Sequence, residues 1–156
     1  MHRKIPNELL IRAAIADDTD QLLEMVSALA DHHGDRAQIA ASDLARDALG
    51  DHPWVQVLVC ELRGRLIGYA ALLPLMQLQF SKRGMDLHHL FVAADYRGNG
   101  IGRALINAAK DLARNHLCSY LVVGTDPGNT DAQAAYLACG FQPVNCFPPR
   151  FRIGLD

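Results

Sequence analysis

The sequence predicts a mixed α/β fold in which helices flank both faces of one central sheet of six to seven strands. Two observations predict it: consecutive strand-like segments occupy the middle of the chain, and strand-like and helix-like segments alternate after them. A length of 156 residues, 50% of them hydrophobic and 21% charged, fits a single domain over residues 1–156. The change from antiparallel to parallel pairing is expected near the glycine-rich stretch after residue 92.

The first half of the chain contains signals for three strands and two helices. The expected elements are a strand at 9–15, a helix from 17 to 34, a short helix from 42 to 50, and strands at 53–62 and 66–75. Asp17 and its neighbours offer capping oxygens to the first helix, and Ser42 or Asp43 caps the second. Arg63-Gly64 indicates a hairpin turn, and Pro74 should end or distort the strand that contains it.

In the second half, strands and helices alternate. The expected elements are a strand at 85–92, a helix reaching about residue 116, a strand at 118–125, a short helix at 130–139, and closing strands at 141–144 and 151–153. If the strand at 85–92 splays from the next one, the gap forms a cleft lined by unpaired backbone groups.

The run Tyr96-Arg97-Gly98-Asn99-Gly100-Ile101-Gly102-Arg103 is the most informative stretch of the chain. It follows an apolar strand and opens a helix, and its alternating glycines leave backbone amides uncovered at the positive end of the helix dipole. Such amides bind phosphate groups, so we expect a phosphorylated ligand there. Two common phosphate motifs fit poorly. The third glycine comes one position too early for G-x-G-x-x-G, and no lysine and hydroxyl pair follows as in a P-loop.

Charge and composition argue against several partners. The net charge is −2 and no Lys/Arg run stands out, so we expect no nucleic-acid surface. No apolar stretch is long enough to span a bilayer and no signal peptide is recognised, so we expect no membrane association. The four cysteines form no C-x-x-C pair, and Cys60 and Cys118 lie in apolar runs where burial is expected. This usage indicates a reducing compartment, hence a cytoplasmic location.

Two motifs together resemble the GNAT superfamily of N-acetyltransferases. Residues 97–102 resemble its R/Q-x-x-G-x-G/A signature, and Asn129, Ala135-Tyr136 and Gly140-Phe141 resemble its N-x-x-A-x-x-x-Y-x-x-x-G-F segment in a slightly varied form. The motifs lie about 30 residues apart and in the family's order. The resemblance implies splayed central strands that form a cleft for acetyl-coenzyme A (acetyl-CoA), which serves as the acetyl donor. The residues it implies for donor binding are Leu90, Phe91, Val92, Arg97, Gly98, Asn99, Gly100, Ile101, Gly102, Arg103, Asn129 and Tyr136.

A second resemblance covers the middle of the chain. Asp43-Leu44, Asp47, Gly50 and His52-Pro53 resemble the D-L-x-x-D-x-x-G-x-H-P segment of the diamine branch, whose members acetylate spermidine, spermine or thialysine. That branch carries adjacent Glu and Asp before its glycine loop, where this chain has His88-His89. Its acidic stretch after the first helix here reads Asp31-His32-His33-Gly34-Asp35-Arg36. A polycation should bind poorly beside these groups, so a smaller amine, or one that carries a carboxylate, fits better.

The resemblance also implies catalytic roles. His88 stands where the branch has its catalytic-site glutamate and is the expected base, directly or through a water; water alone, with His88 as a packing residue, is the alternative. Alternation places His89 on the opposite face of the strand unless a bulge intervenes. Tyr136 is the expected acid that protonates the leaving thiolate. Asn129 is expected to bind the pantetheine arm, to cap a helix, or both.

The acceptor pocket is expected to involve His32, His33, Asp35, Trp54 and His89, and no metal is expected because the histidine spacing fits no ligand motif. The resulting hypothesis is direct acetyl transfer to the primary amine of a small molecule in a ternary complex. Two alternatives stay open: a catalytically silent acyl-CoA sensor, and a protein N-terminal or lysine acetyltransferase. The resemblance further implies a homodimer, to which the segment 147–152 would contribute an edge strand or a partner contact.

Overall fold

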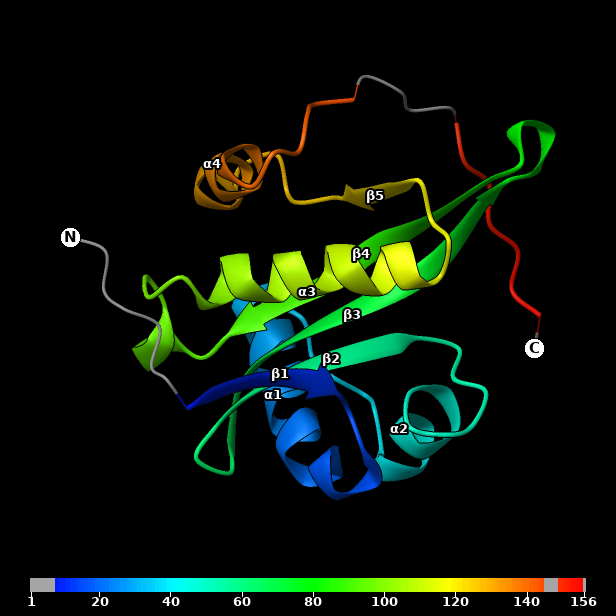
Figure 1. Cartoon of the computed structure of the whole chain (residues 1–156). Coiled ribbons are helices and arrows are strands. Elements are labelled where there is room, and N and C mark those ends of the chain that lie inside the picture. The colour runs from blue at the N-terminus through cyan, green and yellow to red at the C-terminus, as the bar shows by residue number, and fades with distance from the viewer. Residues whose placement is uncertain (1–7, 145–148, 156) are drawn as a thin grey trace. The chain divides into compact units, whose positions relative to one another are not determined.

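The computed structural model describes residues 8–144 and 149–155. The chain forms two compact units, one up to Gly124 and one from Thr125 onward. In the first unit, a five-stranded sheet is flanked by helices on both faces (Figure 1). The predicted mixed α/β class is therefore confirmed, with five strands in the described residues in place of six to seven. The single-domain organisation stays a prediction.

The first unit contains most of the regular structure. Its elements, in chain order, are β1 (Leu9–Ala13), α1 (Thr19–His32), α2 (Ala41–Asp47), β2 (Gln56–Leu62), β3 (Arg65–Gln77), β4 (Lys82–Val92), α3 (Ile101–Asn115) and β5 (Tyr120–Val123). Short 3-10 turns at 16–18, 78–80 and 94–96 connect them.

The second unit contains one helix, α4 (Thr130–Ala138). The closing strands predicted at 141–144 and 151–153 are wrong, because these residues are described and form no strand. Pro143 offers no N–H to a ladder, and Phe151 and Ile153 are exposed without a strand beside them. Of the segment 147–152, the first two residues lie outside the described part of the chain.

The sheet has the order β1-β2-β3-β4-β5 and is antiparallel except for the parallel β4–β5 pair. The predicted hairpin between β2 and β3 is confirmed: Arg63 and Gly64 form its two-residue turn, both with positive φ, as a type I′ turn requires. The switch to parallel pairing occurs at β4, directly before the glycine loop, as the element order predicts.

Pro74 does not end its strand, contrary to the expectation from its missing N–H. β3 continues to Gln77, and Pro74 pairs with Met85 of β4. Pairing of β3 with β2 stops at Leu72, so the other side of Pro74 faces no strand and needs no donor.

Side chains of β3 alternate between two apolar layers, one on each face of the sheet. Tyr69 and Ala71 belong to a cluster with residues of α1 and α2, including Leu22 and Leu44. The opposite face packs against α3, where Leu105 and four other apolar residues of the helix are buried. The sheet between these two layers is therefore the rigid support on which β4 lies. Cys60 is buried, as expected, whereas Cys118 is only half-buried.

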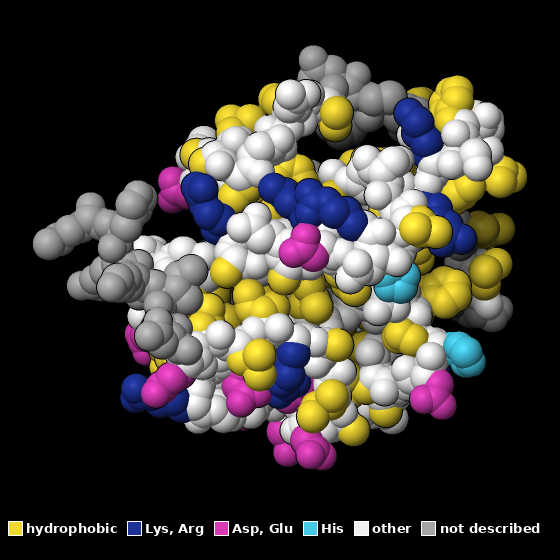
Figure 2. Space-filling model, viewed as in Figure 1, with side chains coloured by type: hydrophobic (Ala, Val, Ile, Leu, Met, Phe, Trp, Pro, Cys, Tyr) yellow, Lys and Arg dark blue, Asp and Glu magenta, His cyan; other side chains and the backbone are white. Residues whose placement is uncertain are grey.

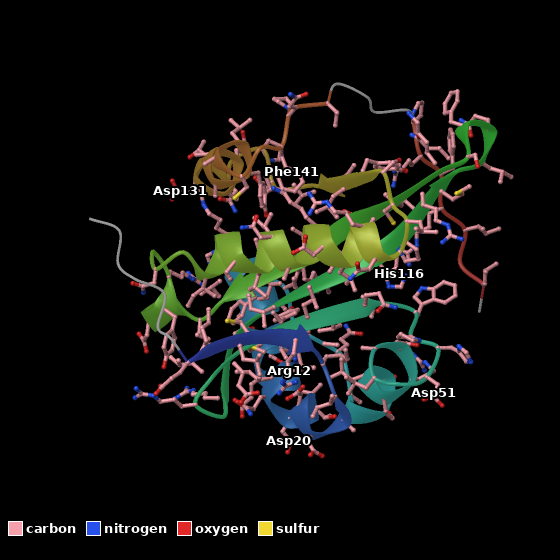
Figure 3. All side chains as sticks on the ribbon, in the orientation of Figure 1. Arg12, Asp20, Asp51, His116, Asp131 and Phe141 are labelled. Atoms are coloured by element: carbon pink, nitrogen blue, oxygen red, sulfur yellow. The ribbon has the colours of Figure 1, made fainter. Side chains whose placement is uncertain are left out.

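A charged cluster joins β1 to the start of α1. Arg12 donates to both carboxylate oxygens of the buried Asp18, at 2.7 and 2.9 Å, and to Glu61 of β2 (Figure 3). Asp18 also accepts the N–H of Ile15. The Arg12 guanidinium holds the pKa of Asp18 below its usual value, so this buried carboxylate stays charged and paired.

Candidate functional site

Strand β4 has two halves that differ in their partners. Residues Gly84 to Leu87 pair with β5 on one side and with β3 on the other, whereas His89 to Val92 pair with β3 alone and His88 pairs with neither strand. β4 and β5 therefore part after Leu87, as the sequence analysis anticipated for the strand before the glycine loop. The second half of β4 presents one open edge.

The backbone groups on this open edge can be identified. A Cβ built on Gly68 of β3 would lie 2.7 Å from the carbonyl oxygen of Phe91, so the polar groups of Phe91 face β3. Strand alternation then directs the N–H and C=O groups of Leu90 and Val92 to the opposite, open edge. The Val92 carbonyl accepts the Nε–H of Arg97 at 2.8 Å. The ring of Phe91 packs on Tyr69 in the core, so only its backbone belongs to the site region.

The glycine loop connects this edge to α3. Gly98 and Gly100 have φ of 74° and 82°, a conformation that other residues adopt at a cost. Gly100 precedes the first residue of α3, and the Asn99 side chain donates to the carbonyls of Tyr96 and Arg97. The buried Ile101 anchors the loop to the core. The first amides of α3 have no partner within the helix, as at the start of any α-helix, and the anion binding that the sequence predicts there stays a prediction.

The surface charge around this helix suits an anion. Basic side chains lie over α3 with an acidic one among them, and further acidic ones lie around α1 (Figure 2). Arg103, in the first turn of α3, is exposed. The cationic groups and the helix dipole therefore act in the same direction.

A β-bulge in β4 changes the expected orientation of the two histidines. Ala71 pairs with His89 and Leu72 with Leu87, so His88 is an extra residue without a partner on β3. Their rings stack, with centroids 4.4 Å apart and planes 14° apart. Both side chains therefore lie on one face of the strand, because a bulge, the exception that the sequence analysis allowed for, interrupts the pleat.

His89 has a buried partner that sequence reasoning missed. The Tyr69 hydroxyl lies 3.0 Å from its Nδ1. Burial, then the nearby His88 and His33, lower the pKa of His89 to about 4. No sequence pattern indicates Tyr69, because its partner depends on the cross-strand register and the bulge.

The other residues predicted for the acceptor pocket are only partly brought together. His33, at the end of α1, is close enough to influence His89, and the rings of His32 and His33 lie 5.7 Å apart. Trp54 is 79% exposed and makes no ring contact with these histidines. Among the described residues, Asp35 forms no salt bridge. The geometry therefore groups His32, His33, His88 and His89 and leaves Trp54 and Asp35 as surface residues.

The second unit carries the remaining predicted residues. The Asn129 side chain accepts the N–H of Ala132 at 3.1 Å, so Asn129 caps α4. Tyr136 lies on α4 with its ring edge-on to Phe141, and burial raises the pKa of its phenol. The predicted roles of both residues toward the donor stay predictions.

Two further observations concern metal ligands and the thiol of Cys60. Across 8–144 and 149–155, no three His, Cys, Asp or Glu side chains converge as metal ligands would. Cys60 is fully buried, and burial raises the pKa of its thiol to about 11, so Cys60 stays protonated. None of the helices in the same residues is long and apolar enough to cross a membrane.

Comparison with known proteins agrees with this geometry. The sequence model of the acetyltransferase (GNAT) family matches residues 20–141 of this chain. Thialysine N-epsilon-acetyltransferase of Bos taurus is 27% identical over 146 residues, covering 87% of this chain and 85% of that protein. N-acetyltransferase family 8 member 3 of Rattus norvegicus is 32% identical over 106 residues, covering 68% of this chain and 46% of that protein. The chain thus spans about half the length of this second relative.

Solved structures confirm the fold. An aminoglycoside N-acetyltransferase, AAC(6')-Iy, solved in complex with CoA, superposes with a TM-score of 0.75 at 21% identity, covering 96% of this chain and 99% of that one. At this identity the likeness concerns the fold alone.

Proposed function

Since this chain belongs to the acetyltransferase (GNAT) family of N-acetyltransferases, as its two motifs predict, we propose that it transfers the acetyl group of acetyl-CoA to the primary amine of a small molecule. The transfer is direct, within a ternary complex. The observation that carries the proposal is the open edge of β4, which begins at the bulge and leads into the glycine loop.

The open edge and the loop fit the donor. The N–H and C=O groups of Leu90 and Val92 suit the amide groups of a pantetheine arm, which would lie along β4 as an added strand does. The uncovered amides at the start of α3 suit its pyrophosphate, and the exposed Arg103 adds positive charge nearby. Arg97 and Asn99 hold the loop in shape through backbone carbonyls. Asn129, as the cap of α4, adds to the donor site in this proposal.

The chain's residues account for each step of the chemistry. The amine nitrogen attacks the thioester carbon, and the carbon–sulfur bond breaks. His88, which is exposed beside the open edge, takes the proton that the amine loses, directly or through a water. A backbone N–H of the open edge polarises the thioester oxygen. Tyr136 gives its proton to the departing thiolate. The buried, protonated thiol of Cys60 is unsuited to carry the acetyl group as a covalent intermediate.

The acceptor is proposed to be amino-acid-like or diamine-like, and not a polyamine. The bovine relative is named for thialysine, a small amine. Two positions that carry carboxylates in the diamine branch are histidines here, and Arg36 has entered the stretch after the first helix, so the pocket offers little attraction to a polycation. The homodimer and the cytoplasmic location expected from the sequence stay predictions; light scattering on the purified protein tests the former.

The proposal is tested by a thiol-release assay with acetyl-CoA and a panel of amines: lysine, thialysine, polyamines, other amino acids, aminoglycosides and short peptides. Turnover of a small amine supports it, and preference for spermine contradicts the acceptor assignment. Acetyl-CoA binding without turnover of any amine favours the silent sensor. Turnover of peptides alone favours a protein acetyltransferase.

The role of Tyr136 has its own test. Burial raises the pKa of this phenol above its usual value, so the proton-donating form persists across neutral pH. We expect Tyr136→Phe to lower kcat about 100-fold, the usual contribution of a general acid, with a smaller change in KM. An unchanged kcat would exclude the acid role.

A further inference from the structure

The Tyr69–His89 hydrogen bond joins a core residue to the site. Tyr69 is only 1% exposed and packs among residues of α1, α2 and β4. Its hydroxyl lies 3.0 Å from Nδ1 of His89, which follows the bulge. Among the described residues, the hydroxyl has no second partner that could take its proton.

The direction of this hydrogen bond follows from the charge states of the two groups. Burial raises the pKa of Tyr69, so its hydroxyl keeps its proton. Burial and the neighbouring His88 and His33 lower the pKa of His89 to about 4, so its ring is neutral above pH 5. A buried hydroxyl proton needs an acceptor, and Nδ1 is the acceptor within reach. The ring proton of His89 therefore resides on Nε2.

The Nε2 atom of His89 is accessible to solvent. In the described part of the chain, every buried side-chain nitrogen or oxygen has a hydrogen-bond partner. Nε2 has no partner there, so it is not buried. His89 thus offers one free N–H donor toward solvent, at the same face on which His88 is stacked.

The groups around His89 disfavour a cation. His88 on β4 and His33 at the end of α1 both act on its ring, and no carboxylate is among the groups that shift its pKa. An N–H donor with imidazole neighbours suits an acceptor oxygen that carries negative charge.

We propose that Tyr69 is a positioning residue that holds His89 as a neutral Nε2–H donor, and that this donor binds a carboxylate of the acceptor amine. The inference rests on the proposed function, because it assigns the acceptor's chemical class. His89 is then a specificity-determining residue, distinct from the base His88. Tyr69 acts through His89 and touches no substrate.

Lysine and cadaverine test the specificity, because they differ by one carboxylate. We expect the wild-type protein to acetylate lysine with at least tenfold higher kcat/KM than cadaverine. His89→Ala should lower kcat/KM for lysine about tenfold more than kcat/KM for cadaverine, as expected for the loss of one charge-assisted hydrogen bond to the carboxylate. His89→Gln, which keeps an N–H donor near the position of Nε2, should retain most of the preference. Equal kcat/KM for the two amines in the wild-type protein would overturn the inference and leave the proposed function standing.

Nitrogen-15 NMR of the imidazole tests the positioning role independently of turnover. We expect the His89 signals of the Nε2–H tautomer between pH 6 and 8, and a mixture of tautomers in Tyr69→Phe. Lysine, added with coenzyme A, should shift the Nε2 signal, whereas cadaverine should not. An Nδ1–H tautomer in the wild-type protein, or no shift with lysine, would overturn the inference. If no amine is acetylated, the proposed function fails. The spectra recorded with lysine and with cadaverine still decide whether His89 binds carboxylates.

Discussion

The two halves of β4 form one continuous strand, yet only one of them is part of the site. The first half, Gly84 to Leu87, is paired on both sides, and its backbone is fully used by the sheet. The second half runs from His88 to Val92; its residues His89 to Val92 pair with β3 alone, His88 pairs with neither strand, and one edge is open. The bulge at His88 marks the boundary. The comparison teaches that the proposed donor site begins where the sheet loses a strand: the backbone groups that join β4 to β5 before the bulge have no neighbouring strand on that side after it.

A glycine in each half shows how closely the strand is packed. Gly68 supports the second half from β3, where an added Cβ would lie 2.7 Å from the Phe91 backbone oxygen and 3.3 Å from the Leu105 side chain. Gly84 lies in the first half, under the ring of Tyr120. The Phe91 backbone beside Gly68 has little freedom to move, whereas the Tyr120 ring beside Gly84 is half-buried and can turn.

The largest expected effect is therefore on stability, from Gly68→Ala. We expect it to lower the free energy of unfolding by about 3 kcal/mol, because backbone or core must shift to admit the methyl group. Gly84→Ala should cost about 1 kcal/mol, and the added substitution Tyr120→Ala should relieve its clash. Urea denaturation measures the free energy of unfolding of all three variants. If Gly84→Ala lowered the free energy of unfolding more than Gly68→Ala, the first half of β4 would be the more closely packed one.

The next largest effect is expected on kcat, from a substitution at His88, the bulge residue between the two halves of β4. We expect His88→Gln to lower kcat about 100-fold and to flatten the dependence of kcat on pH, because the base is lost. His116→Gln is the control, since His116 lies beside the first half, where its carbonyl accepts from Arg83. It should leave kcat unchanged. If His88→Gln alters neither the rate nor its pH profile, water is the base.

A smaller effect is expected at the end of the open edge. Gly100→Ala places a side chain at a φ of 82°, which costs about 1 kcal/mol and distorts the loop amides. We expect the KM for acetyl-CoA to rise about tenfold through weakened phosphate binding. Gly64→Ala is the matched control, because Gly64 has a φ of 79° and lies in the β2–β3 turn. It should lose similar stability at unchanged KM; a rise in KM in both variants would point to a general loss of structure.

Much of the site region could be predicted from local patterns. The glycine loop is a local signal, since alternating glycines before a helix imply uncovered amides wherever they occur. The strand before it and the cap at Asn129 are equally local, and both are confirmed. The element order predicted where pairing becomes parallel, and thus where the sheet opens.

The remaining features depend on contacts between distant residues. His88 and His89 share a face because the β3–β4 register contains a bulge, which no alternation pattern in β4 reveals. Tyr69 reaches His89 for the same reason. Pro74 continues its strand because β2 ends before reaching it, so the missing N–H has no consequence. Each of these outcomes is set by what lies opposite the residue.

Hydrogen–deuterium exchange of β4, with and without coenzyme A, tests most directly whether the open edge is the donor site. In the free protein, we expect slow exchange in Gly84–Leu87 and fast exchange at Leu90 and Val92, whose N–H groups face the open edge. Coenzyme A should slow exchange at Leu90, at Val92 and in the glycine loop, and leave Gly84–Leu87 unchanged. Tight binding of coenzyme A without protection of Leu90 and Val92 would contradict the assignment of the second half of β4 as the donor site.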